Sequence, residues 1–151
     1  MTTTKARSAN MRAIKSVRNR STELRLRSMF IRLGLRGWSV HPPRILGNPD
    51  FVFHQVRVAI FVDGCFWHVC PNCGHIPKAN RTYWVAKLHR NLQRDKSTNR
   101  SLKRAGYTVI RMWECRLRRD PQLCIRRVQR ALENRLSVGG NRFPRPVKRS
   151  T

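Results

Sequence analysis

Apolar residues recur at spacings of three and four in two long stretches of the chain, residues 21–35 and 83–105. The two stripes consist of Leu26, Met29, Phe30 and Leu33, and of Trp84, Leu88, Leu92 and Leu102. This period predicts two amphipathic helices, the first with Ser21 as N-cap and the second ending at Gly106 as C-cap. We expect a last helix over residues 121–136, with Asp120 as its N-cap.

Runs of β-branched and aromatic residues predict strands. Residues 50–54 and 57–62 read as an adjacent pair, and residues 107–113 as a third strand. Prolines and glycines make residues 41–50 a loop, and residues 64–80 have neither period, so they form an irregular loop. The order helix, hairpin, helix, strand, helix predicts a small α/β sandwich in which helices cover a mixed sheet.

Length and charge narrow the class of protein. With 151 residues, 40% of them apolar, the chain is long enough for one domain with a real core. It carries 33 Lys and Arg against 7 Asp and Glu, a net charge of +26, which makes nucleic acid the default partner. A ribosomal or chromatin-like binder would show the same charge, so the charge fixes only the class of partner.

The charge and apolar patterns also suggest how the chain is divided. We expect a basic arm over residues 1–20, a folded domain over 21–136 and a disordered basic tail over 137–151. The chain has no apolar run of the ~18 residues that span a membrane and no signal peptide. The sequence therefore predicts a cytoplasmic protein without a membrane partner.

Five cysteines, an odd number without an export signal, favour metal ligation over disulfides. Cys70 and Cys73 form a Cys-Pro-Asn-Cys knuckle that can grip one tetrahedral Zn²⁺. The preferred zinc set is His41, Cys70, Cys73 and Cys115, with His75 as the alternative to His41. The competing interpretation is that the thiols are small buried hydrophobes, and Cys65 and Cys124 are assigned to it.

Acidic residues are scarce, so each is a candidate ligand for the divalent metal that phosphodiester hydrolysis generally needs. Asp50 opens a strand after Gly-Asn-Pro, and Asp95 lies on the apolar stripe of its helix. The structural alternatives are a local backbone cap for Asp50 and an ion pair with Arg90 or Arg94 for Asp95. Glu23 also favours its helix dipole wherever it points.

Asp63 closes the second predicted strand, and the motif Gly-Cys-Phe-Trp-His follows it directly. Its His68 is placed to act as a general base, although a histidine in such a loop is as often a zinc ligand or a structural hydrogen-bond partner. Phe66 and Trp67 are suited to insertion between base pairs, or else they plug the core. Met11 on the basic arm is a candidate for a second wedge.

Five motifs in order resemble those of the very short patch repair endonucleases. They are Asn10-Met-Arg-Ala-Ile14, Gly47-Asn-Pro-Asp-Phe51, Phe61-Val-Asp-Gly-Cys-Phe-Trp-His68, Pro77-Lys-Ala-Asn80 with Tyr83-Trp84, and Trp113-Glu-Cys115. The resemblance spans residues ~8 to ~135 and implies a bacterial enzyme with a restriction-endonuclease-like PD-(D/E)xK fold and structural zinc. It further implies Mg²⁺-dependent nicking 5′ of the thymine in a T:G mismatch left by deamination of 5-methylcytosine.

The resemblance also implies roles for single residues. Asp50 and the backbone carbonyl of Val62 would hold magnesium, His68 would be the catalytic histidine, and Glu23 and Asp95 would orient water. Asp63 is kept as an additional acid near the phosphate. The expected DNA contacts are Met11, Arg12, Phe66, Trp67 and Lys78.

The implied partner is double-stranded DNA with a T:G mismatch, bound by a monomer close to the nucleoid, and mismatch-repair proteins are potential further partners. Two rival functions stay open. One is a zinc-stabilised DNA-binding protein without catalysis, and the other is a restriction-type nuclease that cuts matched DNA.

Overall fold

The computed structural model describes residues 20–138. The expected arm and tail, including Met11 and Arg12, lie almost wholly outside these residues. Within residues 20–138, no helix has both the length and the apolar character needed to cross a membrane.

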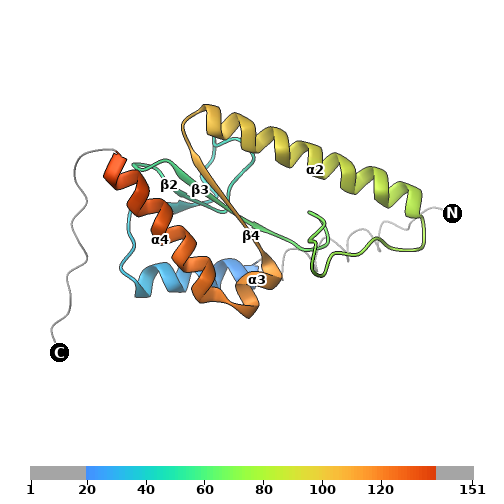
Figure 1. The fold of residues 1–151 in the computed structure, drawn as a ribbon, viewed down its shortest axis with the longest axis horizontal. Coiled ribbons are helices and arrows are strands. Elements are labelled where there is room, and N and C mark those ends of the chain that lie inside the picture. Colours follow the sequence, from blue (N-terminus) through green and yellow to red (C-terminus); the bar gives the residue numbers. More distant parts are fainter. Residues whose placement is uncertain (1–19, 139–151) are drawn as a thin grey trace.

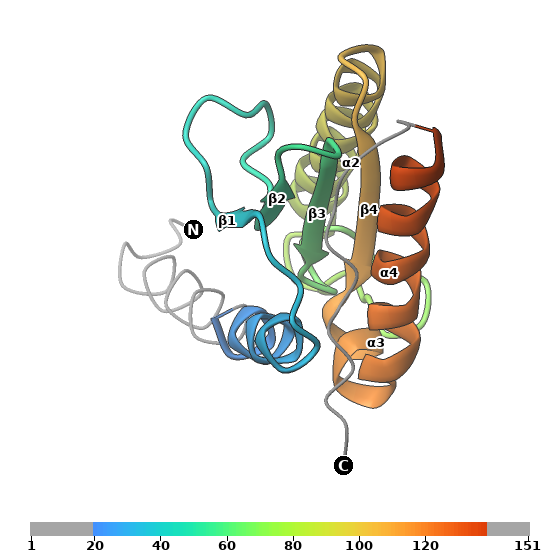
Figure 2. The same cartoon turned by 90° about the vertical axis from the view of Figure 1, so that its left-hand side faces the viewer.

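A four-stranded mixed sheet forms the centre of the molecule (Figures 1 and 2). Its strands are β1 (Trp38–Val40), β2 (Phe51–Phe53), β3 (Val58–Asp63) and β4 (Thr108–Trp113), in that spatial order. β1, β2 and β3 pair antiparallel, whereas β3 and β4 are parallel. The predicted strand pair and third strand are thus confirmed.

The short strand β1 was not predicted. Its three residues carry little periodicity, and their stabilisation comes from distant parts of the chain. The ring of Trp38 lies edge-on to Phe30 and Phe51, with centroids 5.7 and 5.8 Å away. Tertiary packing of this kind overrides weak local preference.

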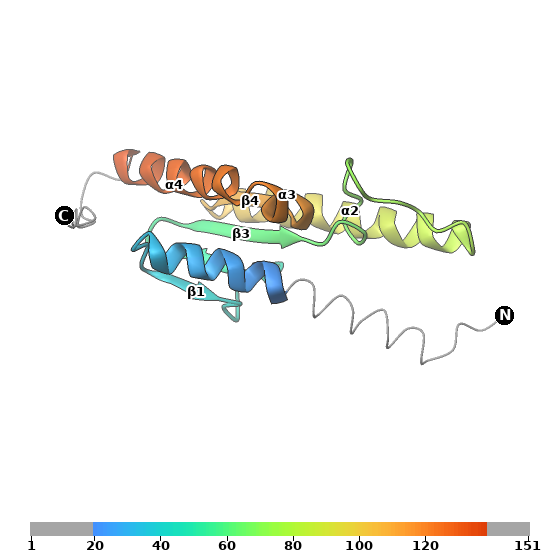
Figure 3. The same cartoon turned by 90° about the horizontal axis from the view of Figure 1, so that it is seen from below.

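Helices cover both faces of the sheet. The chain is helical over residues 20–32 in an N-terminal helix, then in α2 (Arg81–Arg104), α3 (Glu114–Arg119) and α4 (Pro121–Val138). The long α2 connects the parallel strands β3 and β4 and projects past the sheet beside the loop of residues 64–80 (Figure 1). The N-terminal helix and α4 run along the direction of β3 (Figure 3).

Alternate residues of the strands supply two apolar layers. Ile60 and Val62 of β3 face the cluster that contains Leu26 of the N-terminal helix and Val128 of α4. Val52, Ala59 and Phe61 face the other way, toward Leu102 of α2. β3 is buried along its whole length, which explains its nearly continuous apolar sequence.

The helix ends support some of the predictions and correct others. After α2, Tyr107 donates its N–H to Leu102 and Gly106 to Lys103, a Schellman closure in which Gly106 has φ +84°. Asp120 accepts a hydrogen bond from Leu123 N–H at 2.9 Å and so caps α4 as expected. Ser21 is not the N-cap of its helix, because residue 20 is already helical.

Two further details differ from the predicted elements. Leu33 follows the end of the N-terminal helix and is 41% exposed, so it does not belong to the core stripe. The short helix α3 was also not predicted. It directly follows β4 and places Leu117 in the core.

Candidate active site and metal clusters

Asp50 is fixed by the sheet at the point where β2 begins. Its carboxylate accepts a hydrogen bond from the backbone N–H of Val62 in β3 at 2.6 Å, and its own N–H donates to the carbonyl of Ile60. The side-chain bond joins residues twelve positions apart, so Asp50 is not the local loop cap of the alternative interpretation. Val62 contributes its N–H here, which leaves the suggested role of its carbonyl untested.

Glu23 and His41 lie beside Asp50. His41 Nε2 is 2.9 Å from Glu23 Oε2, and His41 Nδ1 is 3.8 Å from Asp50 Oδ1. One ligand atom from each of the three residues falls within 4.8 Å of the others, close enough to share a cation. Burial raises the pKa of the Asp50 carboxyl from 3.8 to about 7, opposed by the Val62 hydrogen bond and reinforced by the charge of Glu23. A carboxylate in such surroundings gains from a bound cation.

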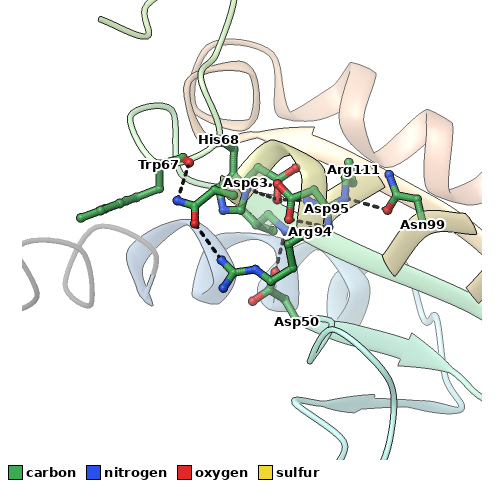
Figure 4. Close-up of polar contacts among 10 residues, drawn as sticks. Asp50, Asp63, Trp67, His68, Arg94, Asp95, Asn99 and Arg111 are labelled. Atoms are coloured by element: carbon green, nitrogen blue, oxygen red, sulfur yellow. Dashed lines mark hydrogen bonds and ion pairs between the residues drawn. The ribbon is translucent and has the colours of Figure 1, made fainter. Parts of the chain in front are cut away.

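A second group of ionisable side chains surrounds His68 (Figure 4). Its Nδ1 is 2.5 Å from Asp95 Oδ2 on α2 and 3.8 Å from Asp63 Oδ1 at the end of β3. Arg111 of β4 contacts both carboxylates, Asp63 at 2.8 Å and Asp95 at 3.3 Å. Burial raises the pKa of Asp63, and the charges of His68 and Arg111 oppose this effect.

This network decides between the interpretations of its members. The prediction that Asp95 points inward is confirmed, and its cationic partner is Arg111 instead of Arg90 or Arg94. His68 pairs with carboxylates and is not one of the clustered thiol ligands. An ionised carboxylate can only accept, so Nδ1 is the donor toward Asp95, and in the neutral imidazole the lone pair is then on Nε2, where it can accept a proton.

Four cysteines gather at one point: Cys65, Cys70, Cys73 and Cys115. The Sγ atoms of Cys70 and Cys115 are 3.7 Å apart, and Cys115 donates its N–H to Cys65 Sγ at 3.4 Å. Gly74 allows the tight turn of the knuckle, since a Cβ there would lie 2.5 Å from the carbonyl oxygen of Cys70. These four thiols could together hold a metal ion.

The thiol cluster corrects two predictions. His41 is not its fourth member, since this residue lies against Glu23 and Asp50, and His75 does not replace it. Cys65, predicted to be an apolar filler, takes that place. Cys124 is buried in the core outside the cluster, as expected.

Electrostatics distinguish the thiols further. Burial would raise the pKa of Cys70, but hydrogen bonds from the backbone N–H groups of Asn72 and Cys73 and from neighbouring thiols lower it to about 7. Backbone donors that favour the thiolate of Cys70 equally favour its binding to a cation.

Phe66 and Trp67 belong to a cluster of rings at the start of α2. Each packs against Trp84, with centroids 5.3 and 6.1 Å away, and the two rings meet edge-to-face at 5.1 Å. The Lys87 ammonium lies 5.4 Å from the Trp67 centroid. Both residues are half-buried and neither is part of the apolar core, so the core-plug interpretation fails.

The sequence interpretation overlooked several members of these clusters. Arg111 was the most informative omission, because a basic residue in the apolar run of β4 faces the same side as Val109 and so needs an acidic partner there. Trp84 was assigned only to the apolar stripe of its helix. Lys78, expected to contact DNA, is exposed in the loop before α2.

Comparison with known proteins places these features in a family. The family model described as DNA mismatch endonuclease Vsr matches residues 1–73. The type II nicking enzyme V.NaeI of Lentzea aerocolonigenes is 45% identical over 113 residues, which cover 72% of this chain and 67% of that one. The DNA mismatch endonuclease Vsr of Escherichia coli K12 is 38% identical over 114 residues, covering 74% and 71%.

A third relative is matched over more of its length. The type II nicking enzyme V.NmeAIP of Neisseria meningitidis serogroup A is 35% identical over 130 residues, covering 85% of this chain and 90% of that one. The resemblance inferred from the five sequence motifs is thereby confirmed, and the chain belongs to the Vsr DNA mismatch endonuclease family.

Proposed function

We propose that this protein nicks duplex DNA at T:G mismatches, on the 5′ side of the thymine, in a reaction that depends on Mg²⁺. The observation that carries the proposal is the site where β2 begins and β3 ends: the Asp50 carboxylate accepts a hydrogen bond from Val62, and His68, in the loop after β3, is paired with Asp95 of α2. A family of mismatch endonucleases and nicking enzymes supplies the reaction class. The same arrangement supports assignment to the restriction-endonuclease-like fold.

The residues around Asp50 fit a divalent cation. Hard oxygen ligands are available from Asp50 and Glu23, and His41 adds a nitrogen within the same group. Asp50 and the Val62 carbonyl would hold Mg²⁺, with Glu23 and His41 next to it. Bound Mg²⁺ would supply positive charge beside the scissile phosphate, where negative charge develops during hydrolysis.

His68 and its carboxylates would move the proton. Asp95 orients the imidazole through Nδ1, so that Nε2 can take a proton from the attacking water. Asp95 then stabilises the imidazolium that results, as a buried carboxylate does beside a catalytic histidine. Glu23, whose carboxylate is held by His41 Nε2 at 2.9 Å, would bind water near the phosphate.

Zinc in the cysteine cluster would be structural. Two thiolates on one tetrahedral Zn²⁺ with Zn–S bonds of ~2.3 Å are separated by about 3.8 Å, and Cys70 and Cys115 are 3.7 Å apart. Bound there, zinc would tie the loop of residues 64–80 to α3. The same loop carries His68 and Trp67. A closed set of four thiols leaves no open position for catalysis.

Contacts to DNA would come from charge and from rings. The net charge of +26 provides affinity for phosphates without regard to sequence. Phe66, Trp67 and Trp84 offer faces on which unstacked bases can pack. Met11, Arg12 and Lys78 remain proposed DNA contacts.

A nicking assay with three duplexes tests the function. End-labelled duplexes that are matched, carry a T:G pair or carry another mismatch are incubated with the protein and Mg²⁺, with and without Asp50→Asn. Nicking 5′ of the mismatched thymine that Asp50→Asn abolishes supports the proposal. Tight binding without cleavage would identify a non-catalytic DNA-binding protein, and cuts in both strands of the matched duplex a restriction-type nuclease.

A further inference from the structure

Arg111 is the ion-pair hub behind His68, and the proposed mechanism does not use it. Its guanidinium makes four contacts: Nη1 with Asp63 Oδ1 at 2.8 Å, Nη2 with Asp95 Oδ1 at 3.3 Å, Nε with Asn99 Oδ1 at 2.9 Å, and Cζ over the ring of Phe61 at 4.4 Å. Its side chain is 19% exposed. A charge this enclosed and this completely paired is unlike the solvated arginines that give the protein its net charge.

The negative charges of Asp63 and Asp95 explain why a positively charged side chain is needed beside His68. Asp63 and Asp95 are both within 4 Å of His68 Nδ1, at 3.8 and 2.5 Å. Two carboxylates facing one N–H compete for it, and each would repel the other. Arg111 binds one oxygen of each, so both carboxylates are held and Asp95 Oδ2 is the oxygen left to accept from His68.

The planar guanidinium suits this task better than a lysine ammonium would. It presents donors in a rigid fork, so that Nη1 reaches Asp63, Nη2 reaches Asp95 and Nε reaches Asn99 at the same time. Asp95 and Asn99 are one turn apart on α2, whereas Asp63 ends β3. The fork therefore sets the distance between α2 and the end of the sheet at the level of His68.

We propose that Arg111 is a positioning residue of the active site, which clamps Asp63 and Asp95 so that the imidazole of His68 keeps one tautomer and one orientation. The inference rests on the proposed role of His68 as the proton acceptor. It assigns Asp63 a supporting role: this carboxylate holds Arg111 and does not need to touch the phosphate.

The test compares three substitutions with a matched control. Arg111→Met keeps the apolar stem on Phe61 and removes the fork, Arg111→Lys keeps the charge, and Asp63→Asn weakens the ion pair. The control is Arg135→Met. Arg135 of α4 donates to Thr108 Oγ1 at 2.8 Å and to the Gly106 carbonyl, at the start of β4 and away from His68. Single-turnover nicking rate and affinity for the T:G duplex are measured for each variant.

A positioning role predicts a split between the two quantities. Arg111→Met should lower the single-turnover rate by about 10²-fold, while duplex affinity stays within about threefold, because the side chain is enclosed and not free to bind phosphate. Arg111→Lys and Asp63→Asn should fall between Arg111→Met and the control. A loss of rate no greater than that of Arg135→Met, or a parallel loss of rate and affinity, would overturn the inference.

A spectroscopic readout keeps the test independent of nicking. The ¹⁵N resonances of the His68 ring, assigned by comparison with His68→Gln, should show an Nδ1–H tautomer in the unmodified protein and a mixture in Arg111→Lys and Asp63→Asn. An unchanged tautomer in both variants would contradict the clamp. If the unmodified protein nicks none of the duplexes, the proposed function fails, and these spectra still decide the role of Arg111.

Discussion

Val62 donates its backbone N–H to the carboxylate of Asp50 across 2.6 Å. The bond occupies Asp50 Oδ2 and leaves Oδ1, which lies 3.8 Å from His41 Nδ1, as the oxygen available to a cation. Because donor and acceptor both belong to paired strands or their immediate ends, the site inherits the rigidity of the sheet.

Asp50→Asn should abolish catalysis and preserve binding. An amide oxygen still accepts the Val62 hydrogen bond, but the ligand charge is lost, so the nicking rate on a T:G duplex should fall by at least about 10³-fold. Duplex affinity, measured by fluorescence anisotropy at fixed salt, should stay within about threefold, because it depends on the arginines and lysines. Residual activity close to that of the unmodified protein would show that Asp50 is not a metal ligand.

The raised pKa of Asp50 predicts how stability changes with pH when no divalent metal is present. Its pKa is about 7 in the folded protein and near 3.8 when unfolded, so between these values the folded state holds a proton that the unfolded state has lost. The free energy of unfolding therefore contains a contribution that is fully present below pH 3.8 and is lost as pH rises through 7. Its size is on the order of 4 kcal/mol.

Denaturant titrations in a chelator test this dependence. The difference in unfolding free energy between the unmodified protein and Asp50→Asn should shift in favour of the variant as pH rises from 4 to 7. The same spectroscopic signal of unfolding is followed at each pH. Added Mg²⁺ should stabilise the unmodified protein near pH 7 and so remove the advantage of the variant, because the cation stabilises the charged carboxylate of Asp50. A difference that stays constant with pH would contradict the shifted pKa.

Cys65→Ala should remove both metal and stability. Loss of one of four thiolates opens the proposed zinc site, so elemental analysis after reducing purification should show much less than one zinc per chain and the Tm should fall. Cys124→Ala is the control, since this thiol is buried in the core outside the cluster. It should lower the Tm through lost packing and leave the zinc content unchanged. Equal zinc content in both variants would refute the four-thiol site.

The sequence predicted the fold better than it predicted the partners of single side chains. The patterns of α2 and β4 were recognisable because each buries a periodic apolar face, and β3 was recognisable because its apolar run is nearly continuous. β1 was not recognisable, since its three residues are held by Phe30 and Phe51 from other elements. Local pattern carries no information about such contacts.

The same limit explains the error at His41. Two prolines follow His41, and the metal group that it joins depends on the direction in which its loop folds over the sheet. The loop brings it to Glu23, eighteen residues earlier, and not to the cysteines. By contrast, the pairing of His68 with Asp95 was approachable, because a carboxylate on the apolar stripe of a helix needs an inward partner.

Trp67→Ala should weaken discrimination of the mismatch more than general affinity. Removal of one stacking face typically costs about 1–3 kcal/mol per base, or roughly 5- to 150-fold in affinity. The loss should appear for the T:G duplex and be small for the matched duplex, whose bases stay stacked. Anisotropy titrations of both duplexes at one salt concentration measure the ratio. An equal loss on the two duplexes would mean that Trp67 supports only the ring cluster with Trp84.

His41→Ala should weaken the binding of divalent metal. The imidazole holds Glu23 at 2.9 Å and faces Asp50, so its loss frees one potential ligand and removes another. Changes to groups that orient metal ligands typically cost about 10- to 100-fold in affinity. Paramagnetic Mn²⁺ titration gives the affinity directly, and the Mg²⁺ concentration for half-maximal nicking should rise in parallel. His54→Ala is the control, since His54 is exposed and bonded to Ser39. Identical Mn²⁺ affinities in the two variants would limit His41 to a structural role in its loop.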